Sequence, residues 1–386
     1  MDGLFKGEKP FIKTKNIISA IIGFMPAMIS TSCSDKSSRE TADGDNIFEE
    51  AVFIKACPKG DDQMSVTVVN PWDSTGVLAE YLLTNPGTTP ATTQEGQTRL
   101  QLPMKRLIVY SAVHAALLAE LGYADAIVGV ADAAYIKTPA IVERLADGRI
   151  TDIGSSMEPS LEKIISLKPD GILISPFQNA GHGVVDKAGV PVIECADYME
   201  TTPLGRAEWS KFYAMLVEGI APTNDRIFKE SREQYDALAK KAAEFPDKPK
   251  VITELQNNGT WMMPGGESYA GRLLMDAGAT YPFAGNKSPG SIPMNYEKAF
   301  MAAQDADFWL VKSFGEEMTL DDIAGNHPLN KRIWAYANKG IYYANTARSN
   351  LFEETPFHPE RLLRDYVAIF HHTGDSLRYY TPILSR

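Results

Sequence analysis

One stretch of this sequence occurs twice in related form. The first copy is PSLEKIISLKPDGILI, residues 159–174, and the second is MNYEKAFMAAQDADFWLV, residues 294–311. Each copy has the pattern of a polar cap, a short helix that opens with Glu-Lys, a turn marked by an aspartate, and a buried apolar strand. Two such copies, far apart in the chain, predict two similar α/β lobes, each with one glutamate (Glu162 or Glu297) near the start of a helix.

The size and charge of the chain narrow the classes of protein that it could be. With 386 residues the chain can bury a large core, and two domains are expected. The formal net charge of -11 argues against binding to nucleic acid or to an anionic membrane surface, because either would need a basic face. We therefore expect a globular two-domain protein that does not bind nucleic acid.

The first residues of the sequence differ in character from the rest. Lys13 and Lys15 precede an apolar run, residues 17–29, which is too short to cross a bilayer as a permanent helix. Cys33 follows, and then a polar stretch, residues 34–45. This layout resembles a bacterial lipoprotein signal, in which Cys33 would be acylated and become the mature N-terminus. An ordinary signal peptide, or an internal anchor with an incidental cysteine, is the alternative.

Strands and helices alternate over the next part of the chain. Apolar strands that alternate with helices predict a parallel sheet covered on both faces. Residues 47–56 and 64–70, before this alternation, also have a strand-like pattern. The expected strands of the parallel sheet are residues 107–110, 126–130, 171–175 and 190–194, and the expected helices are 161–167, 184–188 and a segment capped by Ser111 that runs to residue 121.

Residues from about 205 to 244 break this alternation, because their apolar side chains recur at helical spacing. We interpret them as a helical connection between two α/β halves, although two surface helices would give the same pattern. A second lobe follows, with expected strands at 250–255, 308–311 and 341–344 and helices at 268–277 and 359–370. The predicted organisation is a signal peptide at 1–33, a tether at 34–46, an N-terminal lobe at 47–204, a connecting helix at 205–246 and a C-terminal lobe at 247–386.

Several short motifs follow one another between residues 106 and 371. They are RLIVYSA (106–112), LLAELG (117–122), GVAD (129–132), LKPDGILI (167–174), WMMPGG (261–266), LMDAG (274–278), NKGIYY (338–343) and FHPER (357–361). In order and spacing the chain resembles the periplasmic substrate-binding proteins of ABC importers for iron chelates (siderophores or haem) and cobalamin. The resemblance implies an α/β fold of two Rossmann-like lobes with parallel sheets, joined by a long backbone helix, with the ligand in the cleft between the lobes.

The resemblance also implies partners. Glu162 and Glu297 match the lobe carboxylates that meet arginines on the membrane permease, and a rigid pair of carboxylates can accept bidentate guanidinium contacts. The alternative is that each glutamate only stabilises a helix N-terminus. The implied partners are an ABC permease dimer with its cytoplasmic ATPase, a small chelate ligand, and the membrane, reached through lipid on Cys33. The protein itself would be a monomer in the periplasm, outside the cytoplasm.

The ligand site of such a fold should form from loops at the carboxyl ends of the strands that face the cleft. Aromatic and other amphipathic side chains suit a wide planar or chelated ligand, because they offer a large surface and lose little conformational freedom. Any single one of them could instead belong to the core. The candidate ligand-binding residues are Tyr110, Ser111, His114, Tyr135, Met157, Phe177, Trp261, Tyr269 and Phe314.

Other classes of function are less well supported by the sequence. A nucleophile elbow, a phosphate-binding loop or a dinucleotide fingerprint would stand at a strand–helix junction, and the sequence has none there, so we expect no enzyme. An α/β-hydrolase-like activity is the weakest alternative. A site for free zinc or manganese needs three or four converging histidines or carboxylates, and the six histidines are scattered. We therefore favour a chelated metal as ligand, and no cofactor is expected.

The identity of the chelate stays open. An axial ligand for haem could come from Tyr110, His114 or Tyr135. Cobalamin would need a histidine or water at cobalt and otherwise mostly apolar and hydrogen-bonding contacts. An anionic siderophore would need basic groups in the cleft, and three cations are not a convincing cluster for a highly charged chelate. The candidates are Lys137, His182 and Lys312.

Overall fold

The computed structural model describes residues 45–73, 75–88, 95–221, 225–315 and 317–383. The predicted signal peptide, Cys33 and almost all of the predicted tether lie outside these residues. Within the described ranges, every helix is too short or too polar to span a bilayer.

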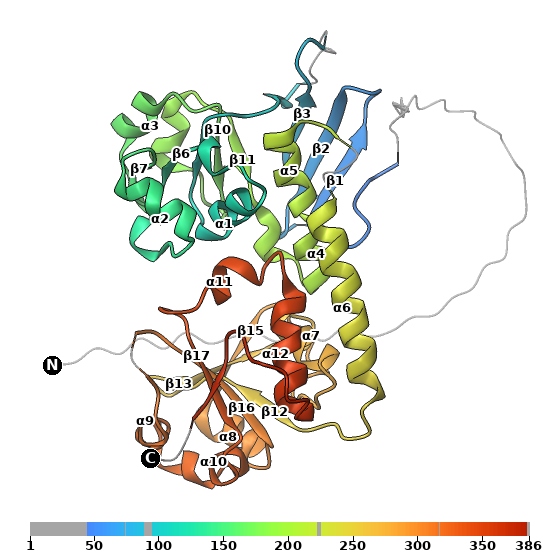
Figure 1. Cartoon of the computed structure of the whole chain (residues 1–386), viewed down its shortest axis with the longest axis vertical. Helices are drawn as coiled ribbons and strands as arrows, with labels where there is room; N and C mark the ends of the chain where they lie inside the picture. Colours follow the sequence, from blue (N-terminus) through green and yellow to red (C-terminus); the bar gives the residue numbers. More distant parts are fainter. Residues whose placement is uncertain (1–44, 74, 89–94, 222–224, 316, 384–386) are drawn as a thin grey trace, which may run out of the picture. The chain divides into compact units, whose positions relative to one another are not determined.

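The first lobe contains the parallel sheet that the sequence predicts (Figure 1). Its strand order is β11-β10-β5-β6-β7, and each neighbouring pair runs parallel. Almost every residue of its central strands is buried, as expected for a sheet with helices on both faces. The strands are β5 Leu107–Val109, β6 Ile127–Val130, β7 Thr151–Asp152, β10 Gly171–Ile174 and β11 Val192–Glu194, and the helices are α1 Ala112–Glu120, α2 Pro139–Ala146 and α3 Leu161–Leu167. A short hairpin, β8 Gly154–Ser155 with β9 Glu158–Pro159, follows β7, and the short helix expected at 184–188 is a 3-10 helix, Gly183–Ala188.

A second sheet, not predicted as such, precedes this one in the chain. Its order is β1-β2-β3-β4, with antiparallel pairs except for β3 and β4, which run parallel. Its inner face joins one hydrophobic core with α1 and with α5. The bounds are β1 Ile54–Pro58, β2 Gln63–Val69, β3 Val77–Thr84 and β4 Thr98–Gln101.

The strand expected at residues 47–56 begins only at Ile54, which corrects the prediction. The physical reason is that residues 49–53 give their backbone N–H groups to two buried carboxylates and not to a neighbouring strand. Glu200 accepts from Val52 and Phe53 at 3.0 and 2.9 Å, and Glu208 accepts from the three residues before them. The strand-like sequence pattern of these residues therefore did not distinguish a strand from a loop whose backbone binds side chains.

Glu208 is the stronger of these two attachments. It is fully buried at the end of α4 (Pro203–Glu208), and it accepts the N–H groups of Glu49, Glu50 and Ala51 at 3.0, 2.7 and 2.9 Å. Lys211 donates to the same carboxylate at 2.7 Å, so the buried charge is paired. One side chain thus holds the start of the described chain against the helical connection.

The helical connection predicted for residues 205–246 is divided into three helices. It consists of α4, α5 (Ser210–Glu218) and α6 (Arg226–Glu244), and α5 ends at Gly219, whose φ of 86° favours glycine. Only α6 is long. It packs against α4 and α5 on one side and against α7 and α12 of the second lobe on the other (Figure 1).

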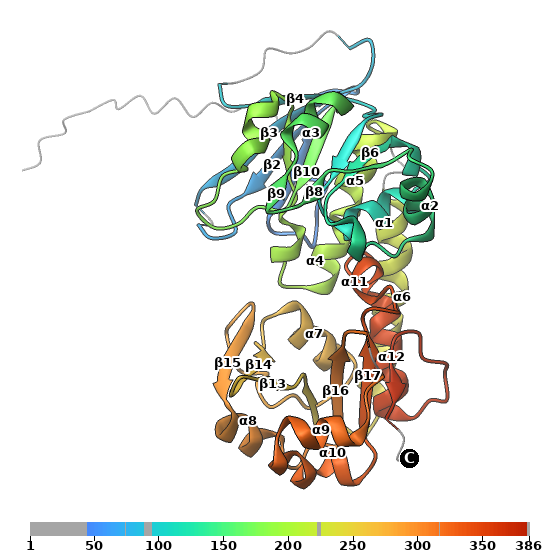
Figure 2. The same cartoon turned by 90° about the vertical axis from the view of Figure 1, so that its left-hand side faces the viewer.

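The second lobe has two sheets (Figure 2). In the larger one, ordered β12-β16-β17-β18, the first three strands run parallel and β18 is antiparallel. The smaller one, β13-β14-β15, is antiparallel and was not predicted. The strands are β12 Val251–Thr253, β13 Gln256–Asn257, β14 Thr260–Pro264, β15 Ser291–Asn295, β16 Phe308–Ser313, β17 Ile341–Asn345 and β18 Thr381–Pro382, and the helices are α7 Tyr269–Asp276, α8 Tyr296–Ala303, α9 Leu320–Asn326, α10 Trp334–Ala337, α11 Leu351–Glu354 and α12 Pro359–His371.

The repeated sequence forms the same structure in both lobes, which confirms the prediction of two similar α/β lobes. Ser160 caps α3 by accepting the N–H of Lys163 at 3.3 Å, and Asn295 caps α8 by accepting the N–H of Lys298 at 3.0 Å. The aspartate that marks the turn after each helix also has one function, because it accepts backbone N–H groups at the entry to the neighbouring parallel strand. These bonds run from Lys105 and Arg106 to Asp170, and from Lys250 to Asp307.

Replacement of Glu208 by alanine should destabilise the first lobe strongly. The variant would leave the N–H groups of Glu49, Glu50 and the buried Ala51, and the ammonium of Lys211, without their partner. Loss of one side of a buried ion pair costs about 3 kcal/mol or more. Urea unfolding of Glu208→Ala, compared with Glu233→Ala on the exposed face of α6, measures this. Equal free energies of unfolding for the two variants would contradict the assigned role.

Candidate ligand-binding site

A large hollow of the first lobe lies where the parallel strands end. It is a cavity of about 780 Å³. Its lining residues follow the carboxyl ends of β5, β6, β10 and β11 and include the tip of the β8–β9 hairpin. An open parallel sheet forms ligand sites at this edge, because the loops that follow its strands meet there. The geometry therefore agrees with the expected position of a ligand site.

The rim of this cavity exposes large apolar side chains. Tyr135, Met157 and Phe177 have exposed fractions of 63%, 82% and 65%. Phe177 lies against Tyr198, with ring centroids 6.5 Å apart, and the Tyr198 hydroxyl donates to the carbonyl of Pro176. Exposed aromatic groups grouped around a concavity are characteristic of a binding surface.

A smaller pocket of about 290 Å³ shares Ala112 and Tyr135 with the cavity and extends it toward the second lobe. Two further exposed aromatic residues, Phe314 after β16 and Phe352 on α11, line it from that lobe. Phe314 is 71% exposed. The combined surface thus presents aromatic groups from both lobes.

The polar end of the cavity is a chain of paired groups. His182 shares a hydrogen bond with Glu194 at 2.8 Å through its Nε2 and with Asp186 at 3.0 Å through its Nδ1. These carboxylates, Glu194 first, raise the pKa of His182 to about 9. The imidazole is therefore charged at neutral pH, and its charge is balanced by its two partners.

The structure brings six of the nine predicted ligand-binding residues to this surface. Tyr110, Ser111, Tyr135, Met157 and Phe177 line the cavity, and Phe314 lines the smaller pocket. Ser111 also has a structural function, because its hydroxyl accepts the N–H of Val113 at the start of α1.

The remaining three predicted residues are placed elsewhere, which corrects the expectation that they face a ligand. His114 is buried, with its Nε2 2.8 Å from Asp197, and packs against Tyr213. Trp261 is fully buried, and its indole N–H donates to the carbonyl of Thr253 at 2.9 Å. The Tyr269 hydroxyl donates to the carbonyl of Thr355 at 2.8 Å. Trp261 and Tyr269 satisfy their polar atoms inside the protein, as core aromatic residues do, whereas the Nδ1 of His114 is buried and has no hydrogen-bond partner among the described residues.

The cations predicted for an anionic siderophore are likewise engaged. Lys312 pairs with Glu254, and the Lys137 ammonium donates to the carbonyl of Thr346 at 2.5 Å. His182 has the two carboxylates described above. The described residues also contain no group of three or more histidine, cysteine, aspartate or glutamate side chains arranged to hold a metal ion.

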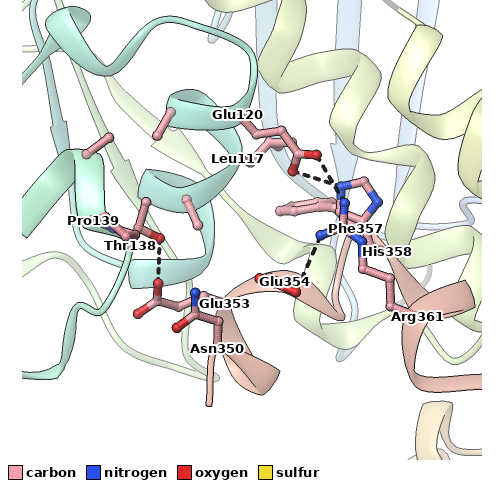
Figure 3. A pocket seen from close by; sticks show the side chains of 13 residues that line it. Leu117, Glu120, Thr138, Pro139, Asn350, Glu353, Glu354, Phe357, His358 and Arg361 are labelled. Atoms are coloured by element: carbon pink, nitrogen blue, oxygen red, sulfur yellow. Dashed lines mark hydrogen bonds and ion pairs between the residues drawn. The ribbon is translucent and has the colours of Figure 1, made fainter. Parts of the chain in front are cut away.

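A third pocket, of about 380 Å³, is lined by residues of both lobes (Figure 3). It differs from the aromatic surface because charged groups of opposite sign close it. His358 is 2.8 Å from Glu120, and Arg361 is 3.2 Å from the same carboxylate. Thr138 donates to Glu353 at 2.5 Å. We interpret this pocket as an inter-lobe contact, because its ionic groups already have partners.

The two glutamates of the repeat lie on corresponding helices. Glu162 is in the first turn of α3 and Glu297 in the first turn of α8, and both are exposed. Neither lines any of the three pockets described above. Their positions leave both carboxylates available to an external partner.

Five curated relatives match the sequence, among them the three that follow. The uncharacterized lipoprotein MJ0878 of Methanocaldococcus jannaschii is 30% identical over 228 residues, which are 55% of this chain and 53% of that protein, so the match spans about half the relative's length. The uncharacterized lipoprotein MJ0872 of the same organism is 24% identical over 366 residues, 91% of this chain and 90% of that protein. The Fe(3+) dicitrate-binding periplasmic protein FecB of Escherichia coli is 25% identical over 265 residues, 66% of this chain and 83% of that protein.

Solved structures share the fold. A possible iron-binding periplasmic solute-binding protein from Staphylococcus epidermidis has a TM-score of 0.55 at 17% identity, over 69% of this chain and 98% of that chain. A periplasmic heme-binding protein from Pseudomonas aeruginosa has a TM-score of 0.55 at 14% identity, over 73% of this chain and 99% of that chain.

Two α/β lobes with an aromatic surface at the strand ends are compatible with a solute-binding protein. The chain belongs to the periplasmic binding protein family, whose profile matches residues 107–347, well over half of its length. This confirms the family, the fold class and the non-enzymatic nature that the sequence predicted. The sheet β1–β4 lies before the matched region.

The buried network around His182 predicts a dependence of stability on pH. Because the folded-state pKa of about 9 exceeds the ordinary value of 6.5, its stabilising effect is complete below pH 6.5 and is lost as the pH rises through 9. Thermal unfolding of His182→Gln should lack this loss. The exposed His372→Gln variant is the control and should behave as wild type. A midpoint near 6.5 for His182 in an NMR titration would contradict the assignment.

Proposed function

We propose that this chain is the substrate-binding component of an ABC importer, and that it captures an iron chelate (siderophore or haem) or cobalamin at the aromatic surface. The exposed Tyr135, Met157, Phe177 and Phe314 around adjoining pockets are the observation that carries this proposal. A cluster of exposed apolar side chains does not stabilise the fold, and such clusters usually mark a binding surface.

The size and chemistry of the surface suit a chelate better than a bare ion. A cavity of about 780 Å³ falls in the usual range for a small organic ligand. A chelator already supplies the donor atoms to its metal, so the protein needs only apolar and hydrogen-bonding contacts with the organic shell. FecB, which is similar to this chain, is named for ferric dicitrate, itself a chelate.

For haem as the ligand, the choice of a side chain that contacts the iron axially would be restricted. His114 is held in the core by Asp197. Burial raises the pKa of Tyr110 to about 12, which opposes formation of the phenolate that ferric iron prefers. Tyr135 is the exposed member of the three predicted axial candidates.

Removal of the aromatic rim should weaken chelate binding without unfolding the protein. We expect Tyr135→Ala with Phe177→Ala to raise Kd by about tenfold or more, since central aromatic contacts commonly contribute above 1 kcal/mol each. Fluorescence and absorbance titrations with cobalamin, haem and ferric siderophores measure this. Trp334→Ala, an exposed aromatic outside both pockets, is the control. Unchanged affinity of the double variant would remove the cavity as the site.

The same proposal assigns the two exposed glutamates to docking. Glu162 and Glu297 lie at equivalent places on α3 and α8, so one receptor with twofold-related basic sites could contact both lobes at once. Charge-assisted contacts of this kind set orientation and association rate more than stability. The favourable effect of each carboxylate on its own helix N-terminus is compatible with this function.

Replacement of both glutamates by glutamine should separate docking from ligand binding. Ligand affinity and stability should stay nearly unchanged, because exposed carboxylates contribute little to folding, while uptake into vesicles carrying the cognate permease should fall about tenfold or more. Glu230→Gln with Glu233→Gln on exposed positions of α6 is the matched control. Normal uptake by the Glu162/Glu297 variant would refute the docking assignment.

We also propose that Cys33 carries a lipid that anchors the protein outside the cytoplasm. The sequence pattern around Cys33 supports this, as do the lipoprotein names of MJ0878 and MJ0872. Cys33→Ser should move the protein from the detergent phase to the aqueous phase in detergent partitioning, because the acyl chains would be lost. If wild type and variant partition identically, the anchor proposal fails.

A further inference from the structure

We propose that the polar end of the cavity selects chelates that are neutral or positively charged and that carry N–H donors. In this proposal Glu194 is the residue that accepts a hydrogen bond from the donor. This inference rests on the proposed function and specifies its ligand class. Its starting point is Glu194, a lining residue of the cavity with one buried carboxylate oxygen that has no partner among the described residues.

Glu194 is held firmly in place. It ends β11 and is 7% exposed, and its backbone N–H donates to the Tyr81 hydroxyl at 2.9 Å. Its Oε1 is 2.8 Å from His182, whereas its Oε2 is buried and lacks a hydrogen-bond partner. A buried carboxylate oxygen without a donor is costly, so a native structure leaves one unpaired chiefly where another molecule supplies the donor. The cavity is the place from which that donor can come, because Glu194 lines it.

Tyr110 repeats the pattern on β5. Tyr110 lines the same cavity, and its hydroxyl is buried and has no partner among the described residues. Burial raises the pKa of this phenol to about 12, so it stays protonated at neutral pH and can donate to a ligand oxygen. The cavity therefore offers one acceptor and one donor. An amide, which has both an N–H and a carbonyl, complements this pair, and an ammonium group satisfies the acceptor with charge.

The net negative charge of the lining residues also favours neutral or positively charged chelates. The acidic and basic side chains of the cavity are Asp132, Glu158, Glu194 and His182, which gives three carboxylates against one imidazolium. The imidazolium is already shared with Glu194 and with Asp186. A polyanionic chelate would thus meet like charge without a free cation from the lining to offset it, and like charges in a partly desolvated site are strongly unfavourable.

Direct titration of the purified full chain tests the selection. The probes are ferrioxamine B, a cationic hydroxamate chelate with amide and ammonium groups; ferrichrome and cyanocobalamin, which are neutral and rich in amides; and ferric dicitrate and haem, which carry carboxylates. Quenching of tryptophan fluorescence and the absorbance of each probe give Kd. We expect at least one cationic or neutral probe to bind about tenfold or more tightly than either carboxylate-bearing probe.

Variants locate the effect. Glu194→Gln should weaken the preferred probe about ten- to a hundredfold, because a charged acceptor is replaced by a neutral amide. The exposed Glu158→Gln should reduce discrimination against ferric dicitrate while leaving the melting temperature unchanged. Glu158→Gln also keeps the test decisive if Glu194→Gln fails to fold. Glu143→Gln, exposed on α2 outside the cavity, is the control.

The outcomes distinguish this inference from the proposed function. Tightest binding of ferric dicitrate or haem would overturn charge selection and leave chelate binding intact. Binding of a neutral or cationic probe that is indifferent to both Glu194→Gln and Glu158→Gln would also overturn it, because the donor would then be read elsewhere. Failure of every probe to bind would instead contradict the proposed function.

Discussion

The parallel pairing of β5, β6, β10 and β11 is the constraint on which the rest of the site depends. Parallel strands bring their carboxyl ends to one edge, and the residues that follow them are released from the sheet there. Tyr110 follows β5, Phe177 follows β10 and Glu194 ends β11, so residues distant in sequence share one cavity. The aspartates of the repeat secure this arrangement, because Asp170 binds the entry of β5 and Asp307 that of β12.

The sequence predicted those parts of the fold that follow from local periodicity. The repeat, the parallel strands and the exposed glutamates depend on patterns within single segments, and all of them appear in the structure. The start of β1 could not be predicted, because residues 49–53 bind Glu200 and Glu208, which lie about 150 residues further along the chain.

For the site, the sequence predicted the apolar rim and named His182, but it missed Glu194. An aromatic residue in a loop after a strand is a recognisable signal, which identified Tyr135, Phe177 and Phe314. The same signal failed for Trp261, because this residue belongs to strand β14 of an unpredicted sheet and is fully buried. Glu194 had no signal of its own in the sequence, because it is the last residue of a buried strand. Its pairing with His182, twelve residues earlier in the chain, becomes visible only in the structure. The pairing of charged side chains from different segments cannot be predicted from the sequence of any single segment.

The helical connection also limits how the lobes can move. Neighbouring residues of α6 bind different lobes: Arg232 pairs with Glu49 at 2.6 Å, whereas Ser231 donates to Glu360 of α12 at 2.5 Å. The buried His358 adds a further inter-lobe bond to Glu120, whose side chain is partly exposed (Figure 3). A wide opening would break these bonds together, and it would leave buried polar groups such as His358 without their partners, which is costly. A small rotation of the lobes that preserves these bonds is therefore favoured. Such a rotation would change the position of Phe314 relative to Tyr135. The hydrogen bonds of Glu194 lie inside one lobe and would stay unchanged. The recognition of donor groups and the closure of the aromatic surface would then be separate events, one fixed by the first lobe and the other by the contact between lobes.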